Sequence, residues 1–548
     1  MNPSISPAPD LSLPESSFNT KKKEPAPPTP HMIRLQEHFP LYGSYALLLA
    51  LFSAFCFFRN PHGITYPLFT AAAYVSAWQI LKSLNFPVKK TALFPAAAAL
   101  FLALNSSFTA SEKIHTLNNL AQILLGAFFL LHQCYDDRRW NIGKYAGSVL
   151  KLFGNAVCAL PLPFLHGRRF LKTVKDSRSR NLLMLLAGFL LSLPVLFYVS
   201  LMFAKADAVF RSILQNGLAE IFRSSAIPEF LLLFLFSFFC CYCLMGSLCA
   251  GKIKESPREV SQKNPLAAIS FCAMLCLLYV FFCGIQIVYL FAGKGTLPDG
   301  MTYSEYAREG FFQLLLVSFF NLVLVLAVLN YFKRHPVLTG CLAVISLCTG
   351  ILLGSSAFRM CLYVAAYGLT FLRLGVLWFL ALLAVLLAGI LLFLFRSAFP
   401  LFRWCLVSSV LFYCAFVWSS PDLQIARWNI AREDGFITQE NVSYILTSLS
   451  VDAAPAVMEA EVAPDVWDYT PPRTPSRYWP SILTEKWQMI CCMPGSPWYE
   501  SRGRQGIAEW LDTLSENLLS WDPGIRTYNA SLARAWELSL EALEESAH

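Results

Sequence analysis

Stretches of about twenty apolar residues recur along most of the chain, separated by short polar segments. The first begins at Leu41 and the last ends near Trp418. A helix of about 20 residues is long enough to cross a hydrocarbon core of about 30 Å. A large buried soluble core would not produce so many such runs in succession, so we predict an all-α, polytopic transmembrane bundle of about eleven spans. The predicted spans are residues 41–58, 64–81, 92–108, 117–134, 181–203, 229–250, 266–292, 310–332, 337–356, 374–395 and 404–419.

Charge is distributed unevenly along the chain. Only 14% of residues are charged, whereas about a quarter are charged in soluble domains. The first 419 residues hold 34 Lys and Arg and 16 Asp and Glu, while the rest of the chain holds 9 and 19. The overall charge of +8 is therefore no sign of nucleic-acid binding. It indicates a positive-inside membrane part joined to an acidic soluble domain.

The basic residues also predict the orientation. With a cytoplasmic N-terminus, 25 of the 34 basic residues before residue 420 lie on the inner side and 9 in outer loops. This bias predicts an extracytoplasmic C-terminus. The expected segments are a disordered cytoplasmic tail (1–40), four spans (41–134), a basic cytoplasmic segment (135–180), a seven-span core (181–419) and a small, mainly helical extracytoplasmic domain (420–548).

Residues 140–165 are apolar enough to suggest a further span. They carry Lys144 and Lys151, and Pro161 and Pro163 near their end. Charges at mid-span are costly, so we expect an amphipathic helix on the inner surface, with its lysines towards anionic lipid. If this segment did cross, the C-terminal domain would be cytoplasmic.

An organised polar stripe lies between the ninth and tenth predicted spans. Arg359, Tyr363, Tyr367, Thr370 and Arg373 follow a helical spacing that would place them on one face about 120° wide. One interpretation is a helix end anchored by snorkelling Arg and interfacial Tyr. The other is the lining of a cavity or of a site for an anionic ligand.

Other polar residues in or near spans are candidates because burying charge in a membrane is costly. Asp207 follows Lys205 and is expected to pair locally or cap a helix, and Asn321 is expected to bond to a neighbouring helix. Glu305 and Arg308 can pair across one helical turn. Asn429 is expected to be a buried structural residue beneath the membrane-proximal helix.

The sequence contains no recognisable catalytic motif. GxSxG, HExxH and Walker-type loops are missing, and no His or Cys spacing suits a metal. A polyprenyl-phosphate glycosyltransferase needs an acidic residue in its first outer loop, and residues 59–63 have none. His132 is the one candidate base for an acyltransferase, and an anchoring role is preferred. We therefore expect no catalytic residue, no cofactor and no metal, and favour a non-enzyme.

Three passages resemble a family of bacterial integral membrane proteins described as a domain of unknown function. They are TYSEYAREGFFQLL from Thr302, FRMCLYVAAYGLTFLRL from Phe358, and SSPDLQIARWNIARE from Ser419. The resemblance runs from about residue 180 to the end, with a weaker match, TYNASLARA, from Thr527. It implies a multi-span fold with a soluble tail in the bacterial plasma membrane, and no activity.

These observations favour a non-enzymatic protein that senses, binds or scaffolds something at the cell envelope. The expected partners are the lipid bilayer and an anionic lipid or envelope protein. Two alternatives stay open: a transporter or lipid-handling protein that uses polar residues of the last four spans, and a membrane-embedded transferase without a recognisable motif.

Overall fold

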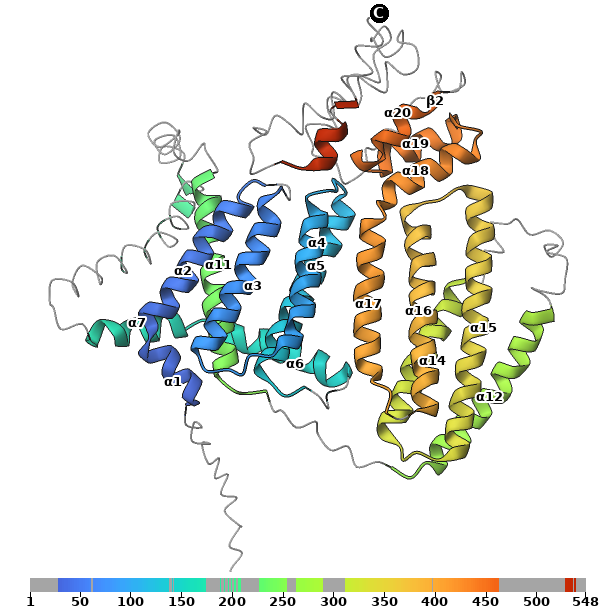
Figure 1. Cartoon of the computed structure of the whole chain (residues 1–548), viewed down its shortest axis with the longest axis horizontal. Helices are drawn as coiled ribbons and strands as arrows, with labels where there is room; N and C mark the ends of the chain where they lie inside the picture. Colours follow the sequence, from blue (N-terminus) through green and yellow to red (C-terminus); the bar gives the residue numbers. More distant parts are fainter. Residues whose placement is uncertain are drawn as a thin grey trace, which may run out of the picture.

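Long helices stand side by side in two groups, with a small domain across one end (Figure 1). This computed structural model describes residues 28–60, 63–137, 140, 142–173, 226–253, 263–288, 311–396, 398–462, 528–535 and 537–538, and single positions between 188 and 207. Within these residues the fold is all-α apart from one pair of two-residue strands. The predicted fold class is confirmed in this respect.

The N-terminal group packs around α2 and α11, with α5 at the border of the second group (Figure 1). Its core buries Leu35, Tyr42, Leu84, Leu131 and Tyr242. Its helices are α1 (Pro30–Glu37), α2 (Phe39–Phe57), α3 (Thr65–Ser83), α4 (Leu93–Ser106), α5 (Glu112–Cys134), α6 (Ile142–Cys158), α7 (Leu162–Thr173) and α11 (Ala226–Cys249).

The second group is built on α15, which contacts α12, α14 and α16. Its core buries Leu342, Ile345 and Leu352. Its helices are α12 (Leu266–Gln286), α14 (Phe311–Tyr331), α15 (Pro336–Tyr367), α16 (Phe371–Phe395) and α17 (Leu401–Trp418). The two groups meet where α17 packs on α4.

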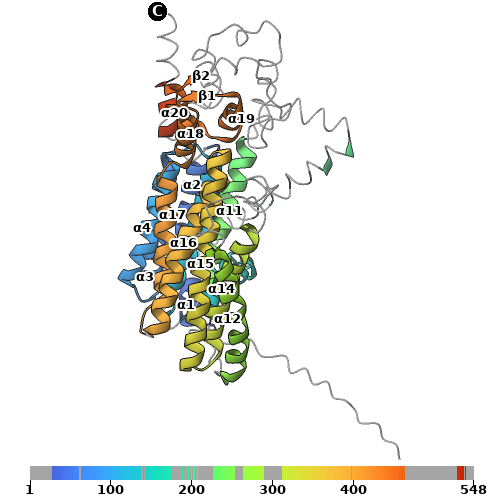
Figure 2. The same ribbon diagram turned by 90° about the vertical axis from the view of Figure 1, so that its right-hand side faces the viewer.

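A cap of short elements covers one end of the bundle, opposite α1, α6 and α7 (Figures 1 and 2). The strands β1 and β2 pair in parallel, with Phe436 opposite Glu461 and Ile437 opposite Val462. The short helix at 530–535 lies at the same end (Figure 1). The cap elements are α18 (Pro421–Arg432), β1 (Phe436–Ile437), α19 (Gln439–Ser448), η3 (Val451–Ala453), α20 (Ala454–Glu459) and β2 (Glu461–Val462).

Eight of the described helices are long and apolar enough to cross a membrane. They are α2, α5, α11, α12, α14, α15, α16 and α17. The predicted spans 64–81 and 92–108 correspond to α3 and α4, which fall outside this set; α4 has only 14 residues. The predicted span 181–203 lies outside the described residues apart from single positions. The number eleven therefore stays a prediction.

The solvent around these helices must be lipid. Large apolar side chains project outwards along them, for example Leu48 at 63%, Phe281 at 71% and Leu316 at 68% exposure. A soluble bundle would turn such side chains inwards, because exposing a large apolar surface to water is unfavourable. The chain is therefore a membrane-embedded, multi-pass protein.

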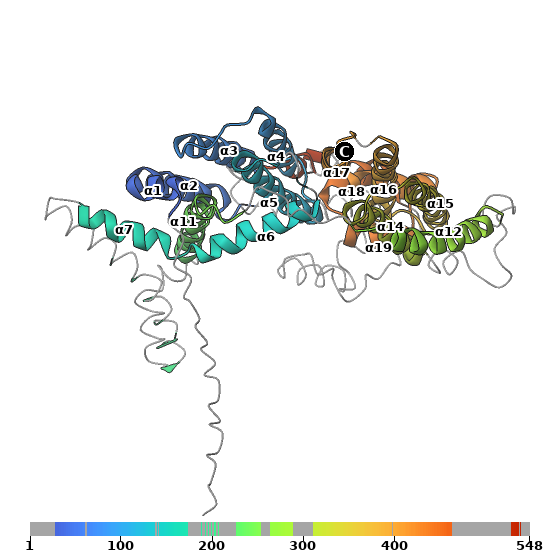
Figure 3. The ribbon, with the colours of Figure 1, turned by 90° about the horizontal axis from the view of Figure 1, so that it is seen from below.

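The helices α6 and α7 lie across the lower ends of the N-terminal group rather than beside its long helices (Figures 1 and 3). They are bent by 48° relative to each other, and taken together they would add a ninth candidate span. Residue Gly246 of α11 packs against Ala159 and Leu162 at this bend. The bend between the two helices thus rests on α11.

Candidate functional site

The predicted polar stripe does not lie on one helix, and that part of the prediction is wrong. The helix α15 continues from Pro336 past residue 356 and ends at Tyr367. Gly368 then takes a positive φ of 74°, a conformation that favours glycine and commonly ends helices. Thr370 starts α16 as its N-cap, accepting a hydrogen bond from the Arg373 N–H at 3.3 Å.

Arg373 nevertheless reaches back to the residues before the turn. Its Nη1 donates to the carbonyl oxygens of Tyr367 at 2.8 Å and Gly368 at 2.5 Å. Its guanidinium carbon lies 4.1 Å from the centroid of the Tyr363 ring. Arg359 lies one turn before Tyr363 on α15 and is partly buried. Arg373 thus donates hydrogen bonds to carbonyl groups at the end of α15, where carbonyl groups lack partners within the helix.

Asn429 fixes the same turn from the cap. Its amide oxygen accepts from the Leu369 N–H at 2.7 Å, and its amide nitrogen donates to the Leu369 carbonyl at 2.8 Å. A Cβ at Gly368 would come within 2.8 Å of that oxygen. The side chain is 7% exposed, so Asn429 is a structural link between α18 and the α15–α16 turn.

Asn321 lies inside the second group, 1% exposed. It accepts from the Tyr279 hydroxyl at 2.7 Å and donates to Thr349 Oγ1 at 2.9 Å. These bonds join α14 to α12 and α15, and they occupy polar atoms that a transported solute would need.

The remaining candidates do not form a site with these residues. Glu305 and Arg308 lie outside the described residues. Asp207 is described, and its backbone N–H donates to the Phe203 carbonyl at 2.9 Å. Among the described residues, no three His, Cys, Asp or Glu side chains are grouped so that they could hold a metal ion.

A buried carboxylate joins the cap to the N-terminal group. Asp452, in η3, accepts the Ala110 N–H at 2.7 Å and the hydroxyls of Thr109 and Ser531. Burial raises the pKa of Asp452 more than these three hydrogen bonds lower it, and the nearby Asp422 raises it further. The sequence gives no sign of this contact, because its three partners come from segments more than 75 residues away.

Asn529 completes this contact, which we call the outer clasp (Thr109, Ala110, Asp452, Asn529 and Ser531). Its amide donates to the Thr109 carbonyl at 2.8 Å and to the Ser106 carbonyl at 3.4 Å. The clasp therefore ties the cap and the segment 528–535 to the α4–α5 loop. Residues 463–527 of the predicted domain 420–548 lie outside the described residues.

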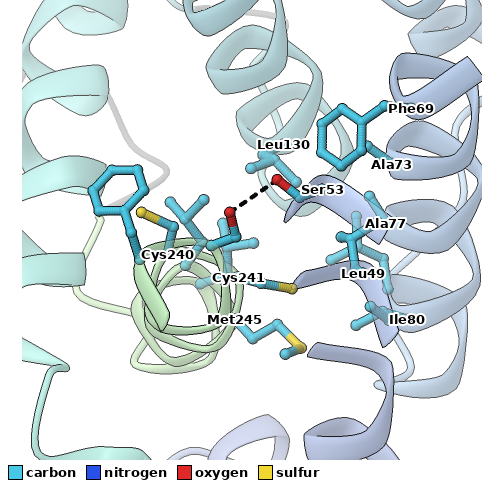
Figure 4. Close-up of a pocket in the computed structure, with 15 residues that line it drawn as sticks. Leu49, Ser53, Phe69, Ala73, Ala77, Ile80, Leu130, Cys240, Cys241 and Met245 are labelled. Carbon is cyan, nitrogen blue, oxygen red and sulfur yellow. Dashed lines mark hydrogen bonds between the residues drawn. The ribbon is translucent and has the colours of Figure 1, made fainter. Parts of the chain in front are cut away.

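An apolar cavity of about 250 Å³ opens between α2, α3, α5 and α11 (Figure 4). Ala73 and Ala77 of α3 face Cys240 and Met245 of α11 across it. The lining residues are Leu49, Ser53, Phe69, Ala73, Ala77, Ile80, Leu81, Leu130, Phe236, Ser237, Cys240, Cys241, Leu244, Met245 and Leu248.

The polar atoms of this lining are already satisfied. Ser53 and Ser237 bond to each other at 2.9 Å (Figure 4). An apolar cavity of about 150 Å³ stays dry and binds hydrocarbon in other proteins. The sequence could not reveal this cavity, because it is a gap among four helices, although small residues at 71–73 and 77 are the signal that leaves room for it.

The family described as a domain of unknown function (DUF4153) matches residues 96–460. This is about two thirds of the chain. The chain belongs to this family. The match begins within α4 and ends just before β2. It therefore starts earlier than the resemblance in the sequence suggested, and it stops short of the segment 528–535.

No curated protein and no solved structure matches the chain. Membership of the family assigns no activity, and the multi-pass architecture rests on the apolar helices of this chain.

Proposed function

We propose that this DUF4153 protein is a lipid-handling protein of the cell membrane, which takes one acyl chain of a bilayer lipid into the cavity between α2, α3, α5 and α11. The observation that carries this proposal is an apolar cavity whose two serines bond to each other. A polar solute would find no free partner in it, whereas hydrocarbon would lose nothing by entering.

The surroundings of the cavity favour a bilayer lipid over a soluble apolar ligand. The helices that line it also expose apolar side chains outwards, including Leu51 at 48%, Leu124 at 52% and Leu232 at 71%. A chain in the bilayer can therefore enter sideways without crossing water. The polar groups of the last four spans are a weaker candidate for a lipid site than the cavity. Asn321 and Arg373 already form hydrogen bonds with neighbouring protein groups.

The helices α6 and α7 would then lie in the cytoplasmic face of the membrane. Ile142, Leu150 and Val157 form an exposed apolar row on α6, at 46%, 74% and 66% exposure. With 3.6 residues per turn, Lys144 and Lys151 fall on a different face. An apolar row on one face with lysines on another is typical of helices that lie in the interface of an anionic membrane.

Filling the cavity tests the proposal. Ala77→Phe places a ring in the cavity, while Val75→Phe adds the same ring on the exposed side of the same helix. We expect protein purified in mild detergent to retain lipid, measured by mass spectrometry as lipid per protein. Ala77→Phe should lower that ratio at least fivefold, and Val75→Phe should leave it unchanged. Equal lipid in all three proteins would contradict the proposal.

A second candidate function, sensing or scaffolding by the outer domain, is favoured by one observation. The outer clasp and Asn429 hold the cap onto both helical groups, so a ligand on the cap would act on the membrane helices directly. Deleting residues 430–548 separates the two functions. A sensor should lose its response entirely, whereas the cavity should still retain lipid.

A further inference from the structure

Three side chains at the lower end of the N-terminal group form a hydrogen-bonded chain. Thr91 lies in the 3₁₀ turn η1 (Lys90–Ala92), which leads into α4. Its Oγ1 lies 2.7 Å from Nε2 of His132, near the end of α5, and His132 Nδ1 lies 2.5 Å from Oδ2 of Asp137. These distances are those expected for a nucleophile, a base and the group that orients the base.

The neighbours of Asp137 keep it ionised. Burial alone would raise the pKa of Asp137, but hydrogen bonds from His132 and Tyr145 and the charges of His132 and Lys89 lower it overall. The Lys89 ammonium lies 3.9 Å from its second oxygen. An ionised carboxylate can only accept, so the proton of a neutral His132 belongs on Nδ1. Nε2 then carries a lone pair, and the Thr91 hydroxyl must donate to it.

The ring of His132 is held in place for this task. It is stacked on Phe128, with ring centroids 5.8 Å apart and planes 8° apart. Lys89 Nζ donates to the carbonyls of His132 and Tyr135, at 2.6 and 2.5 Å, and so fixes the end of α5. The side chains of His132 and Asp137 are 15% and 10% exposed, while Thr91 is exposed. The nucleophile is thus accessible and its partners are sheltered.

A lipid-facing surface leads to this site. Leu124, Phe128 and His132 succeed each other at four-residue intervals on one face of α5, and Leu124 is 52% exposed. Leu93, two residues after Thr91, is 73% exposed. Lys90 is also exposed and would attract a lipid phosphate at the membrane surface. An acyl chain lying along this face would bring the ester at its head to the level of Thr91.

We infer that Thr91, His132 and Asp137 form a hydrolytic site for acyl esters of membrane lipids. Thr91 Oγ attacks the ester carbonyl carbon while His132 Nε2 takes the hydroxyl proton. The bond from carbonyl carbon to leaving oxygen then breaks, and His132 gives the proton to that oxygen, which leaves as an alcohol. Water attacks the acyl-threonine ester, and its proton passes through His132 to Thr91, releasing the fatty acid.

The fold supports this chemistry electrostatically. The positive end of the α4 dipole lies beside Thr91 and favours the negative charge that develops on the attacked carbonyl oxygen. The inference goes beyond the cavity: the two sites share α5 but no residue. Substitution of Thr91 should therefore leave the lipid retained by the cavity unchanged, so the failure of one proposal is distinguishable from the failure of the other.

The test uses full-length protein in vesicles of phosphatidylglycerol and phosphatidylethanolamine that contain a phospholipid with a fluorescent acyl chain. We expect steady release of the fluorescent fatty acid. Thr91→Ala, His132→Gln and Asp137→Asn should each lower the rate about 100-fold or more, the contribution of a positioned base. Thr116→Ala, at an exposed threonine on the other end of α5, is the matched control and should not change the rate.

Two further readouts separate catalysis from a structural role. Thr91→Ser keeps the hydroxyl and should preserve release, and a lipophilic fluorophosphonate should label residue 91 in both the parent and this variant. Release that is unaffected by Thr91→Ala, or no release and no labelling of residue 91 in the folded parent, would overturn the inference.

Discussion

At the scale of single residues, Arg373 makes interactions that a lysine at this position would not reproduce. It lies over the Tyr363 ring and donates to two carbonyls at the end of α15. Arg373→Lys should lower the free energy of unfolding by about 1 kcal/mol. The ammonium group of lysine is compact, so it stacks less well on the Tyr363 ring and donates less well to two carbonyl groups than a planar guanidinium does. Arg427→Lys, at an exposed position on α18, should have no effect. The measurement is thermal unfolding in detergent; equal melting temperatures would show that the stacking contributes nothing.

Asp452 should make the outer clasp sensitive to pH. Burial raises its pKa above the ordinary 3.8, so the folded state favours the neutral carboxyl. That stabilisation is fully present below pH 3.8 and is lost as pH rises through the raised pKa. Protection of the α4–α5 loop from hydrogen exchange, measured relative to the intrinsic exchange rate at each pH, should therefore be greater near pH 4 than near pH 8, and Asp452→Asn should flatten this difference. A parent protein with exchange protection independent of pH would contradict the assignment.

At the scale of elements, the packing of α16 on α17 depends on a missing side chain. A Cβ at Gly389 would overlap the Trp404 ring, whose Nε1 donates to the Val385 carbonyl at 3.1 Å. Gly389→Ala should destabilise the protein by about 1–3 kcal/mol through overpacking. Gly340→Ala has open space around it and should gain up to about 1 kcal/mol from helix propensity. Thermal unfolding should show a lower melting temperature for Gly389→Ala and a higher one for Gly340→Ala. If both melting temperatures rose, α17 would be able to move and make room for the added methyl group.

Helix positions could largely be predicted from the sequence, because a bilayer forces apolar runs to be helical and of set length. The predicted 310–332 and 374–395 correspond to α14 (Phe311–Tyr331) and α16 (Phe371–Phe395). The error at 356–373 has a local cause. The helical spacing of the polar residues continues through Gly368, but α15 ends at Tyr367 and the chain turns at Gly368. Arg373 therefore reaches back across the turn to the Gly368 carbonyl instead of continuing the same helix face.

The candidate sites could not be predicted in the same way. His132 stood out in the sequence, but nothing links it to Thr91, 41 residues earlier, until α4 and α5 pack together. The cavity likewise needs four helices to exist. Local pattern decides which segments are helices, whereas sites arise from contacts between segments.

At the scale of the whole molecule, the proposed orientation places the cap outside the cell. The N-terminal helix α1 lies at the same end of the bundle as α6 and α7, and the cap lies at the opposite end (Figure 1). The chain must therefore cross the membrane an odd number of times between α1 and the cap. A reporter enzyme that is active only outside the cytoplasm should be active when it is fused after His548. The same reporter inserted in the α6–α7 segment should be inactive. An expressed fusion protein whose reporter is inactive at both places would overturn the eleven-span topology.

In the proposed function, an acyl chain of a bilayer lipid occupies the cavity between α3 and α11. The most direct measurement is photo-crosslinking in vesicles with a phospholipid that carries a diazirine halfway along one acyl chain, followed by peptide mapping. Label should concentrate on the cavity-lining residues of α3 and α11, such as Ala73, Ala77 and Cys241, and Ala77→Phe should remove it. Label spread evenly over the exposed faces of α12 and α14, and unchanged by Ala77→Phe, would contradict the proposed function.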